Sequence, residues 1–226
     1  VVDGKLQEKV CIKGADGVIT AITLNCAETP DSSHSGTLIP GFVDIHSHGG
    51  AGFYFSDLSP ENVAAARNTH LSHGTTTHIA SLVTEPIGVL EEQILRLVPM
   101  VNAGVFEGIH LEGPYLSHTR CGAHDPQLLV TPDLAEIKEL LELADGAIKM
   151  ITIAPELPGA VEAIKYLSAA GVTVAIGHSD GAFIDAAAGT NAGASVVTHF
   201  MNGMNKSLTE GSFASFVVAD ERLSVE

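Results

Sequence analysis

Apolar segments alternate with short polar loops along most of the chain, in blocks whose lengths fit strands and helices in turn. Segments rich in β-branched residues predict six strands, at 42–48, 75–82, 105–113, 148–156, 172–180 and 195–202, with a seventh starting near Leu223. Amphipathic segments between them predict helices at 59–74, 86–104, 131–144, 159–171 and 180–193. Two of these begin with typical start signals, Ser59-Pro60 and Thr131-Pro132.

Repeated strand and helix units favour an α/β fold. Because no glycine-rich dinucleotide fingerprint accompanies them, they predict a (β/α)8 TIM barrel rather than a doubly wound sheet. The count falls short of eight strands, and a missing strand would leave parallel edges unpaired. We therefore expect an incomplete barrel of about six to seven strands, in a chain truncated at its C-terminus.

The first 38 residues have a different pattern. Short apolar runs at 6–12 and 18–24 are separated by the turn signal KGADG, and a polar, serine-rich stretch follows at 29–36. A two-strand unit needs partners to be stable. We expect residues 1–38 to form part of a small β-sandwich domain and residues 39–226 to form the barrel.

Net charge and cysteine content limit the kinds of partner and cell compartment that we expect for the protein. A formal charge of −16 argues against nucleic acid, and neither a secretory leader nor an apolar run long enough for a membrane span is seen. The three cysteines, Cys11, Cys26 and Cys121, form an odd set without a close pair, so we expect no disulfide framework and a reducing cytoplasm. A small-molecule substrate in the cytoplasm fits this balance best.

Polar residues close several predicted strands, and in a barrel these ends meet at the active-site face. His46 and His48 close the first strand, Glu112 the third, and His178 and His199 the fifth and sixth. The HxH spacing puts two imidazoles on one face of a strand, where they can share a cation. Each residue alone has an ordinary alternative as a polar strand end or a structural histidine.

Taken together, Glu112, His178 and His199 supply two nitrogens and one oxygen, a set used for Zn²⁺ when a further position is left for water. A carboxylate in a barrel mouth also needs compensation, which a divalent cation provides. The sequence therefore predicts a metal centre of one or two ions, with Zn²⁺ favoured and Fe²⁺, Mn²⁺ or Co²⁺ as alternatives.

The motifs PGFVDIHSHGG, HGTTTHIASL, GIHLEGPYLS with GAHDP, ITIAPE, GHSDG and THFMN occur in this order along nearly the whole chain. In this combination the chain resembles the N-acetylglucosamine-6-phosphate deacetylases of the amidohydrolase superfamily. The resemblance implies a cytoplasmic enzyme of amino-sugar catabolism, assembled as a homodimer. The reaction that the resemblance implies is metal-dependent hydrolysis of N-acetyl-D-glucosamine 6-phosphate to D-glucosamine 6-phosphate and acetate.

The same resemblance assigns individual roles. It implies that Glu112, His178 and His199 bind the principal metal and that His46 and His48 add a second. The substrate-binding residues that it implies are Ala123, His124, Asn202 and Gly203, with Ala123 and His124 contacting the sugar phosphate.

Three departures from the family stand out. Asn202-Gly203-Met204 replaces the usual Asn-Ala-Met, and the stretch 205–210 lacks the family's phosphate-binding arginine, for which Lys206 is a point-charge substitute. The catalytic residue, an Asp that moves the proton, is expected beyond Glu226.

Two alternatives remain open. One is a catalytically inactive metal-binding fragment, or an interaction protein on a barrel scaffold, since a fold does not fix a function. The other is a related amidohydrolase that acts on another acetylated amino-sugar phosphate or on a cyclic amide. HLEGP argues against the cyclic amidases, because many of them hold their metals with a carboxylated lysine and no lysine ends a strand in the equivalent position.

Overall fold

The computed structural model describes residues 5–226, in two compact units that meet between Phe42 and Val43. The boundary expected from the sequence lies at 38/39. That residues 1–38 belong to a β-sandwich stays a prediction, and residues 1–4 lie outside the described residues. The two units are described separately below.

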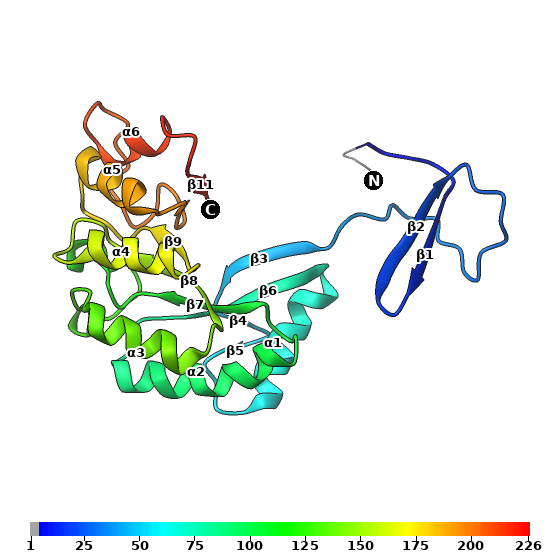
Figure 1. Ribbon diagram of the computed structural model, residues 1–226, viewed down its shortest axis with the longest axis horizontal. Coiled ribbons are helices and arrows are strands. Elements are labelled where there is room, and N and C mark those ends of the chain that lie inside the picture. Colours follow the sequence, from blue (N-terminus) through cyan, green and yellow to red (C-terminus); the bar gives the residue numbers. More distant parts are fainter. Residues whose placement is uncertain (1–4) are drawn as a thin grey trace. The chain divides into compact units, whose positions relative to one another are not determined.

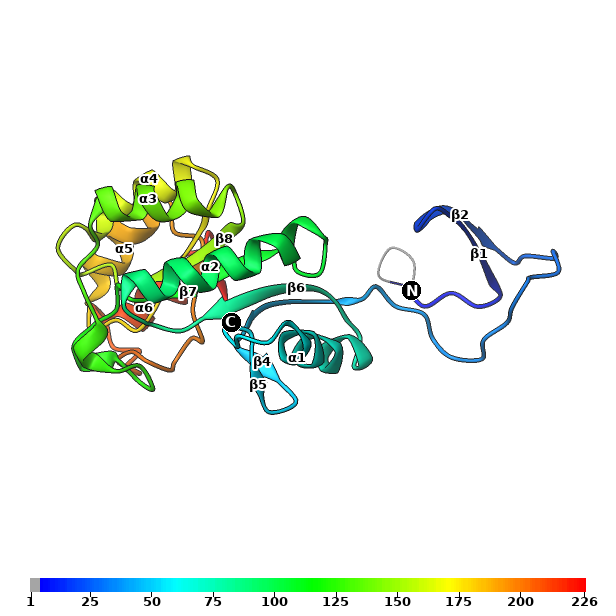
Figure 2. The same ribbon diagram turned by 90° about the horizontal axis from the view of Figure 1, so that it is seen from below.

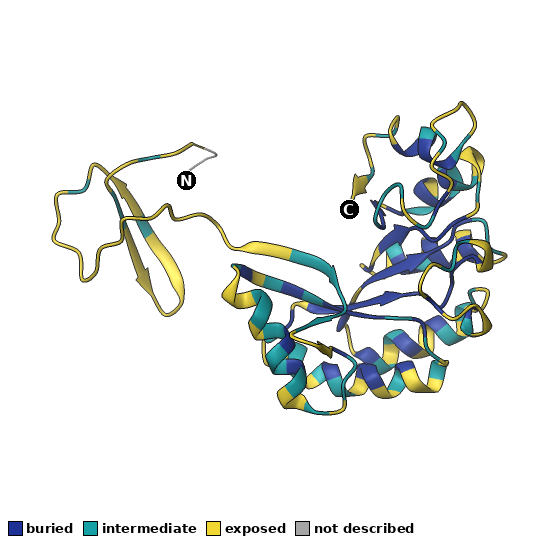
Figure 3. Ribbon diagram, turned by 180° about the vertical axis from the view of Figure 1, so that it is seen from behind, coloured by how far each residue is buried: buried dark blue, intermediate teal, exposed yellow. Residues whose placement is uncertain are grey.

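The first unit contains an antiparallel hairpin of β1 (Val10–Ala15) and β2 (Val18–Leu24). The turn is shorter than the KGADG signal suggests, because only Asp16 and Gly17 lie between the two strands. Both have positive φ, 51° and 77°, the backbone of a tight two-residue hairpin turn that Asp-Gly favours. Most side chains of the two strands are exposed (Figure 3).

Cys11 and Cys26 form a disulfide, so the expectation that the cysteines are not paired in disulfides is wrong. The hairpin register sets Cys11 opposite Thr23, and the chain after β2 stays close because the Cys26 amide donates to the Lys9 carbonyl. A sequence separation of 15 residues becomes a Cα distance of 5.6 Å. Only Cys121 is a free cysteine within residues 5–226.

The second unit is built on a curled seven-stranded sheet, which makes the fold an α/β incomplete barrel (Figure 1). From one edge to the other the strands are β3 (Phe42–Ser47), β6 (Thr75–Leu82), β7 (Gly108–Glu112), β8 (Ile148–Ile153), β9 (Thr173–Ile176), β10 (Val196–Val197) and β11 (Ser224–Val225). Pairing is parallel from β6 to β11. All seven strands predicted from the apolar pattern are present, including the one near Leu223.

The five predicted helices are also present, as α1 (Pro60–Ser72), α2 (Ile87–Asn102), α3 (Leu134–Ala144), α4 (Ala160–Ala169) and α5 (Phe183–Ala192). Ser59 and Asp133 cap the starts of α1 and α3 with their side-chain oxygens. In Figure 1, α2, α3 and α4 follow one another along one side of the sheet.

Shorter elements escaped prediction because their residues carry no clear period. These are a hairpin of β4 (Gly49–Gly50) and β5 (Phe53–Tyr54), the single-turn helices at His118–Arg120 and Pro126–Leu128, and α6 (Phe213–Val217). Figure 2 shows the hairpin beside α1. No helix within residues 5–226 has both the length and the apolar content needed to cross a membrane.

Side-chain alternation gives the sheet two different faces. Ile109 and Leu111 of β7 pack into the large core beneath the helices, each fully buried, and burial of one such side chain contributes roughly 1.5–3 kcal/mol. The opposite face is partly polar. There His110 bonds Ser81 at 3.0 Å and Thr152 at 2.9 Å, so its buried ring nitrogens are satisfied. Glu112 follows His110 by two residues and therefore lies on the same inner face.

Candidate metal centre

Glu112, at the end of β7, is the hub of a cluster of imidazoles. Its Oε1 atom lies 3.2 Å from Nε2 of both His178 and His199, and its Oε2 atom lies 3.0 Å from Nε2 of His48. His46 Nε2 is 3.4 Å from Oε1. Thus the four histidines predicted as metal ligands surround the carboxylate of the fifth, Glu112, whose side chain is 5 % exposed.

Hydrogen bonds on the far side of the rings fix where the lone pairs point. The Nδ1 atoms of His48, His178 and His199 face the backbone carbonyls of Ser81, Arg120 and Asn202, at 3.2, 2.7 and 3.2 Å. A carbonyl can only accept, so these Nδ1 atoms carry the proton. In the neutral rings Nε2 is therefore bare and directed at Glu112.

The spacing of the bare nitrogens fits a divalent cation. His178 Nε2 and His199 Nε2 are 3.0 Å apart, and His46 Nε2 and His48 Nε2 are 3.2 Å apart. Two nitrogens bound to one Zn²⁺ in tetrahedral geometry lie about 3.3 Å apart. Lone pairs this close repel unless a proton or a cation lies between them. Oε1 of Glu112 faces His178, His199 and His46, and Oε2 faces His48, so the carboxylate can contribute to one ion or to two.

The electrostatics point the same way. Burial alone would raise the pKa of Glu112, but the hydrogen bond from His124 and the close contacts with the other imidazoles outweigh it and hold this pKa well below its usual range. Burial lowers the pKa of His46, yet contacts with Glu112 and Glu226 raise it to about 9. The hydrogen bond to Glu112 likewise raises the pKa of His199. The cluster therefore attracts positive charge, which a divalent cation supplies in place of protons.

His124 enters the cluster in the opposite tautomer. Its Nδ1 atom accepts from the backbone N–H of Thr84 at 3.3 Å, so Nε2 carries the proton. That Nε2–H points to Glu112 Oε2 at 3.4 Å. His124 is 9 % exposed and is held as a donor, which distinguishes it from the ligand histidines.

The other predicted substrate residues lie on the loops beside the cluster. Ala123 precedes His124 and is exposed, and Asn202 contributes its carbonyl to His199 while its side chain is exposed. Gly203 has φ +60°, and a Cβ there would lie 3.1 Å from His199 and 3.2 Å from His178. The glycine at this position thus leaves room for two ligand rings.

Two acidic residues near the ligands were missed by sequence reasoning. Glu226 Oε2 lies 2.8 Å from His46 Nδ1, so it orients that ring as the carbonyls orient the others. Glu156 accepts from Ser179 Oγ at 2.6 Å and from the Asp180 amide at 2.7 Å, which holds the loop after His178. The sequence signal for both is their position just after an apolar strand.

The predicted phosphate substitute, Lys206, is exposed. A second cation contacts the ligand cluster directly: Arg120, whose carbonyl orients His178 and whose Nε donates to Asp180 at 2.8 Å. Its side chain is 33 % exposed, so it is accessible to an anion from solvent.

Known proteins resemble this chain closely. A deacetylase of N-acetylglucosamine 6-phosphate from Lysinibacillus sphaericus is 35% identical over 171 residues, which cover 74% of this chain and 44% of the relative. A deacetylase of N-acetylgalactosamine 6-phosphate from Shewanella is 34% identical over 212 residues, covering 89% and 53%. The resemblance inferred from the motifs is thereby confirmed.

Solved structures agree. The N-acetyl-D-glucosamine-6-phosphate deacetylase of Mycobacterium smegmatis superposes with a TM-score of 0.86 at 39% identity, covering 95% of this chain and 57% of that one. A variant of that enzyme in complex with N-acetyl-D-glucosamine-6-phosphate gives a TM-score of 0.83 at 40% identity, covering 92% and 55%.

The chain spans about half the length of the relatives it matches. The profile of the Amidohydrolase family, however, matches residues 37–218, which is most of the sequence and includes all five predicted metal ligands. On these grounds the chain belongs to the amidohydrolase family.

Proposed function

We propose that this chain carries the metal centre of a deacetylase that hydrolyses N-acetyl-D-glucosamine 6-phosphate to D-glucosamine 6-phosphate and acetate. The observation that carries the proposal is the convergence of the Nε2 atoms of four imidazoles on the two oxygens of Glu112. Relatives named for this reaction support the substrate.

In the proposed site Glu112, His178 and His199 hold the principal divalent cation, and His46 and His48 contribute to a second. The bound metal supplies Lewis acidity toward the acetyl carbonyl and lowers the pKa of water at the site. Glu112 provides the negative charge that retains the cation, while the backbone carbonyls of Arg120 and Asn202 keep two imidazoles oriented toward it.

The chain's own polar groups complete the proposal. The Nε2–H of His124 is a ready donor to a substrate oxygen, held in that tautomer by Thr84. Asn202 and Gly203 belong to the loop after His199 and lie beside the ligand rings. A carboxylate must move the proton from water to the leaving amine, and we assign this step to an Asp expected beyond Glu226.

A deacetylase of N-acetylgalactosamine 6-phosphate is the second candidate. Two relatives carry that name, and one of them aligns with 89% of this chain. The two sugars differ in the orientation of one hydroxyl group, and both present the same acetamide and phosphate. Residues 205–210 contain no arginine, so Lys206 is the cation of this stretch that could contact the phosphate of either sugar.

The test is acetate release by the protein as its gene encodes it, with both sugar phosphates and with unphosphorylated N-acetylglucosamine. We expect N-acetyl-D-glucosamine 6-phosphate to give the highest kcat/KM and the unphosphorylated sugar to give a value lower by at least about 10-fold, through loss of charge-assisted contacts. Faster turnover of the galactosamine compound would favour the second candidate. Absence of acetate release from all three, with metal bound, would contradict both.

The identity of the metal, the oligomeric state and the cell compartment are further parts of the proposal. We propose Zn²⁺ as the native metal, a homodimer as the assembly and the cytoplasm as the compartment. The cytoplasmic proposal rests on the family resemblance alone, because the Cys11–Cys26 disulfide removes the argument from cysteine usage. Elemental analysis, light scattering and fractionation of source cells address the three in turn.

A further inference from the structure

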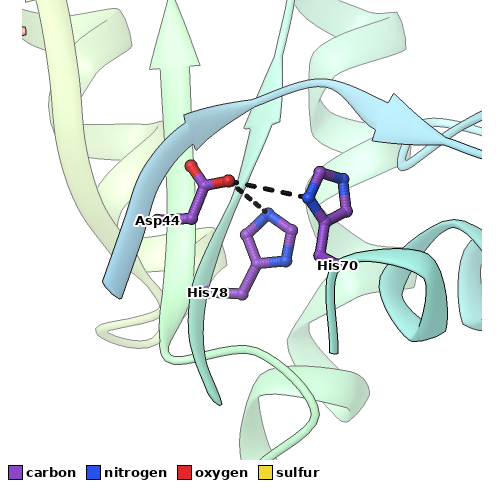
Figure 4. A group of neighbouring side chains, drawn as sticks. All are labelled: Asp44, His70 and His78. Carbon is purple, nitrogen blue, oxygen red and sulfur yellow. Dashed lines mark ion pairs between the residues drawn. The ribbon is translucent and has the colours of Figure 1, made fainter. Parts of the chain in front are cut away.

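A second group of metal-ligand side chains lies outside the Glu112 cluster. Asp44 of β3, His70 of α1 and His78 of β6 point toward one another (Figure 4). Asp44 Oδ2 lies 3.7 Å from His70 Nδ1 and 3.9 Å from His78 Nε2. We call these three residues the Asp44 trio. None of them belongs to the set predicted from the sequence.

His70 and His78 of the Asp44 trio lie on the helix side of the sheet, whereas the Glu112 cluster lies on its inner face. Asp44 shares its strand parity with His46 of β3 and contacts both histidines of the trio. His78 alternates with Ala80 and Leu82, whose side chains join the core beneath the helices, and His70 comes from helix α1 itself. Glu112 instead follows His110 on the inner face. The two groups share no side chain, so one can bind a cation independently of the other.

Hydrogen bonding leaves a lone pair directed into the trio. His70 Nε2 lies 2.9 Å from the Gly49 carbonyl and therefore carries the proton, so Nδ1 of the neutral ring is bare and faces Asp44 Oδ2. A bare nitrogen opposite a carboxylate is repulsive. The other carboxylate oxygen, Oδ1, accepts from the His46 amide at 3.1 Å, which leaves Oδ2 available.

The third member adds a neutral ring in apolar surroundings. The His78 side chain is fully buried, and the rings of Phe55 and Phe106 pack on it with centroids 5.0 and 5.7 Å away. Burial lowers the pKa of His78 to about 4, so the ring is neutral near pH 7. Its Nδ1 has no hydrogen-bond partner, and its Nε2 contacts Ser47 Oγ at 2.5 Å.

The distances between Asp44 and the two histidines leave room for an ion between the three side chains. At 3.7 and 3.9 Å the contacts to Asp44 are too long for hydrogen bonds. The three ligand atoms lie within 4.8 Å of one another, and those around a tetrahedral Zn²⁺ lie about 3.3 Å apart, so the side chains must draw together to complete the site. Ser47 would have to turn its hydroxyl away from His78. A water molecule is the competing occupant.

We propose that Asp44, His70 and His78 form a separate cation site, on the helix side of the sheet, that takes one divalent transition-metal ion such as Zn²⁺ or Co²⁺. Two imidazoles and one carboxylate are a suitable donor set for these ions. Because only His70 has its outer nitrogen anchored, this site binds more weakly than the Glu112 cluster.

The test is the amount of Co²⁺ bound per chain after equilibrium dialysis, measured by elemental analysis on variants shown to be folded by circular dichroism. His70→Gln keeps an N–H for the Gly49 carbonyl but removes the ligand nitrogen, and His78→Gln removes the buried ligand. Each should lower bound Co²⁺ by about one equivalent. His73→Gln, at the exposed C-terminal end of the same helix, is the matched control and should change nothing.

Glu112→Gln separates this proposal from the proposed function. It should empty the Glu112 cluster and leave about one equivalent of Co²⁺ in the protein. Full Co²⁺ content in folded His70→Gln and His78→Gln, or none in Glu112→Gln, would overturn the proposal. If the variants do not fold, anomalous diffraction from Co²⁺-soaked crystals of the unaltered protein decides. A peak between Asp44, His70 and His78 supports the site, and its absence refutes it.

Discussion

The Glu112 cluster and the Asp44 trio combine the same residue types in different states of preparation. In the cluster the paired imidazole nitrogens lie 3.0–3.2 Å apart, and each outer nitrogen is held by a carbonyl or by Glu226. In the trio the contacts are 3.7–3.9 Å long, and His78 Nδ1 has no partner. Hydrogen bonds to the second ring nitrogen thus fix the direction of the lone pairs in the Glu112 cluster. In the Asp44 trio the His78 ring lacks such a bond, so its side chains must move to bind an ion.

Removing the central charge of the cluster should have the largest effect. Glu112→Gln keeps the side-chain size but offers a neutral amide to the cation, so we expect the dissociation constant of the principal metal to rise by at least about 100-fold. Competition with a chromophoric chelator measures this constant. His118→Ala, in the single-turn helix at His118–Arg120, is the control and should bind metal normally. The reverse outcome for the two variants would refute the ligand assignment.

Protonation of the metal-free cluster should make stability depend on pH. The pKa of His46 is raised to about 9, so its contribution to folding is present below about pH 6.5 and is lost as pH rises through 9. We expect the free energy of unfolding in EDTA to fall by roughly 2 kcal/mol between pH 6.5 and 9. His78 has a lowered pKa and contributes nothing in this window.

Urea denaturation at the two pH values measures the change. His46→Gln should reduce the dependence, leaving a smaller part from His199, whose pKa is also raised, whereas His78→Gln should leave the slope between pH 6.5 and 9 nearly unchanged. An equal slope in the unaltered chain and in His46→Gln would show that other groups govern it.

Loosening the loop after His178 should have a moderate effect. Glu156→Gln weakens the bonds to Ser179 and the Asp180 amide, and such supporting contacts change metal affinity by about 10-fold. The expected signature is weaker binding at the Glu112 cluster with no change in the Asp44 trio. Unchanged affinity in a folded variant would mean that the Arg120 carbonyl alone orients His178.

The smallest effect is expected at Gly203. An alanine there would be strained at φ +60° and would press its Cβ against the rings of His178 and His199. We expect Gly203→Ala to weaken metal binding by about 3- to 10-fold, or roughly 1 kcal/mol. Gly211→Ala, also at positive φ but with open space around its Cβ, controls for backbone strain. An equal loss of metal affinity in both variants would show that backbone strain, and not contact with the ligand rings, causes the effect.

Sequence periodicity predicted the strands and helices of the barrel because buried strands and amphipathic helices repeat with different periods. It placed Glu112 and the ligand histidines correctly at strand ends, since parallel strands bring those ends together. It did not reveal the Asp44 trio. The alternation of His78 with Ala80 and Leu82 predicts only that His78 faces the core, and gives no sign of its neighbours. Only the packing of α1 on β6 brings His70 to His78.

The Cys11–Cys26 pairing and Glu226 were missed for a similar reason. A disulfide depends on the hairpin register, and 15 residues of separation carry no signal without it. Glu226 gains its role from contact with His46, 180 residues away. Long-range contacts of this kind follow from the tertiary fold and have no local pattern.

The central claim is that the Glu112 cluster holds a divalent cation. The most direct measurement is elemental analysis of the purified protein, prepared without chelators, together with Glu112→Gln prepared in parallel. We predict at least about one equivalent of a transition metal per chain, with Zn²⁺ dominant, and a loss of about one equivalent or more in the variant. Less than about a tenth of an equivalent in the unaltered protein, or full content in folded Glu112→Gln, would contradict the claim.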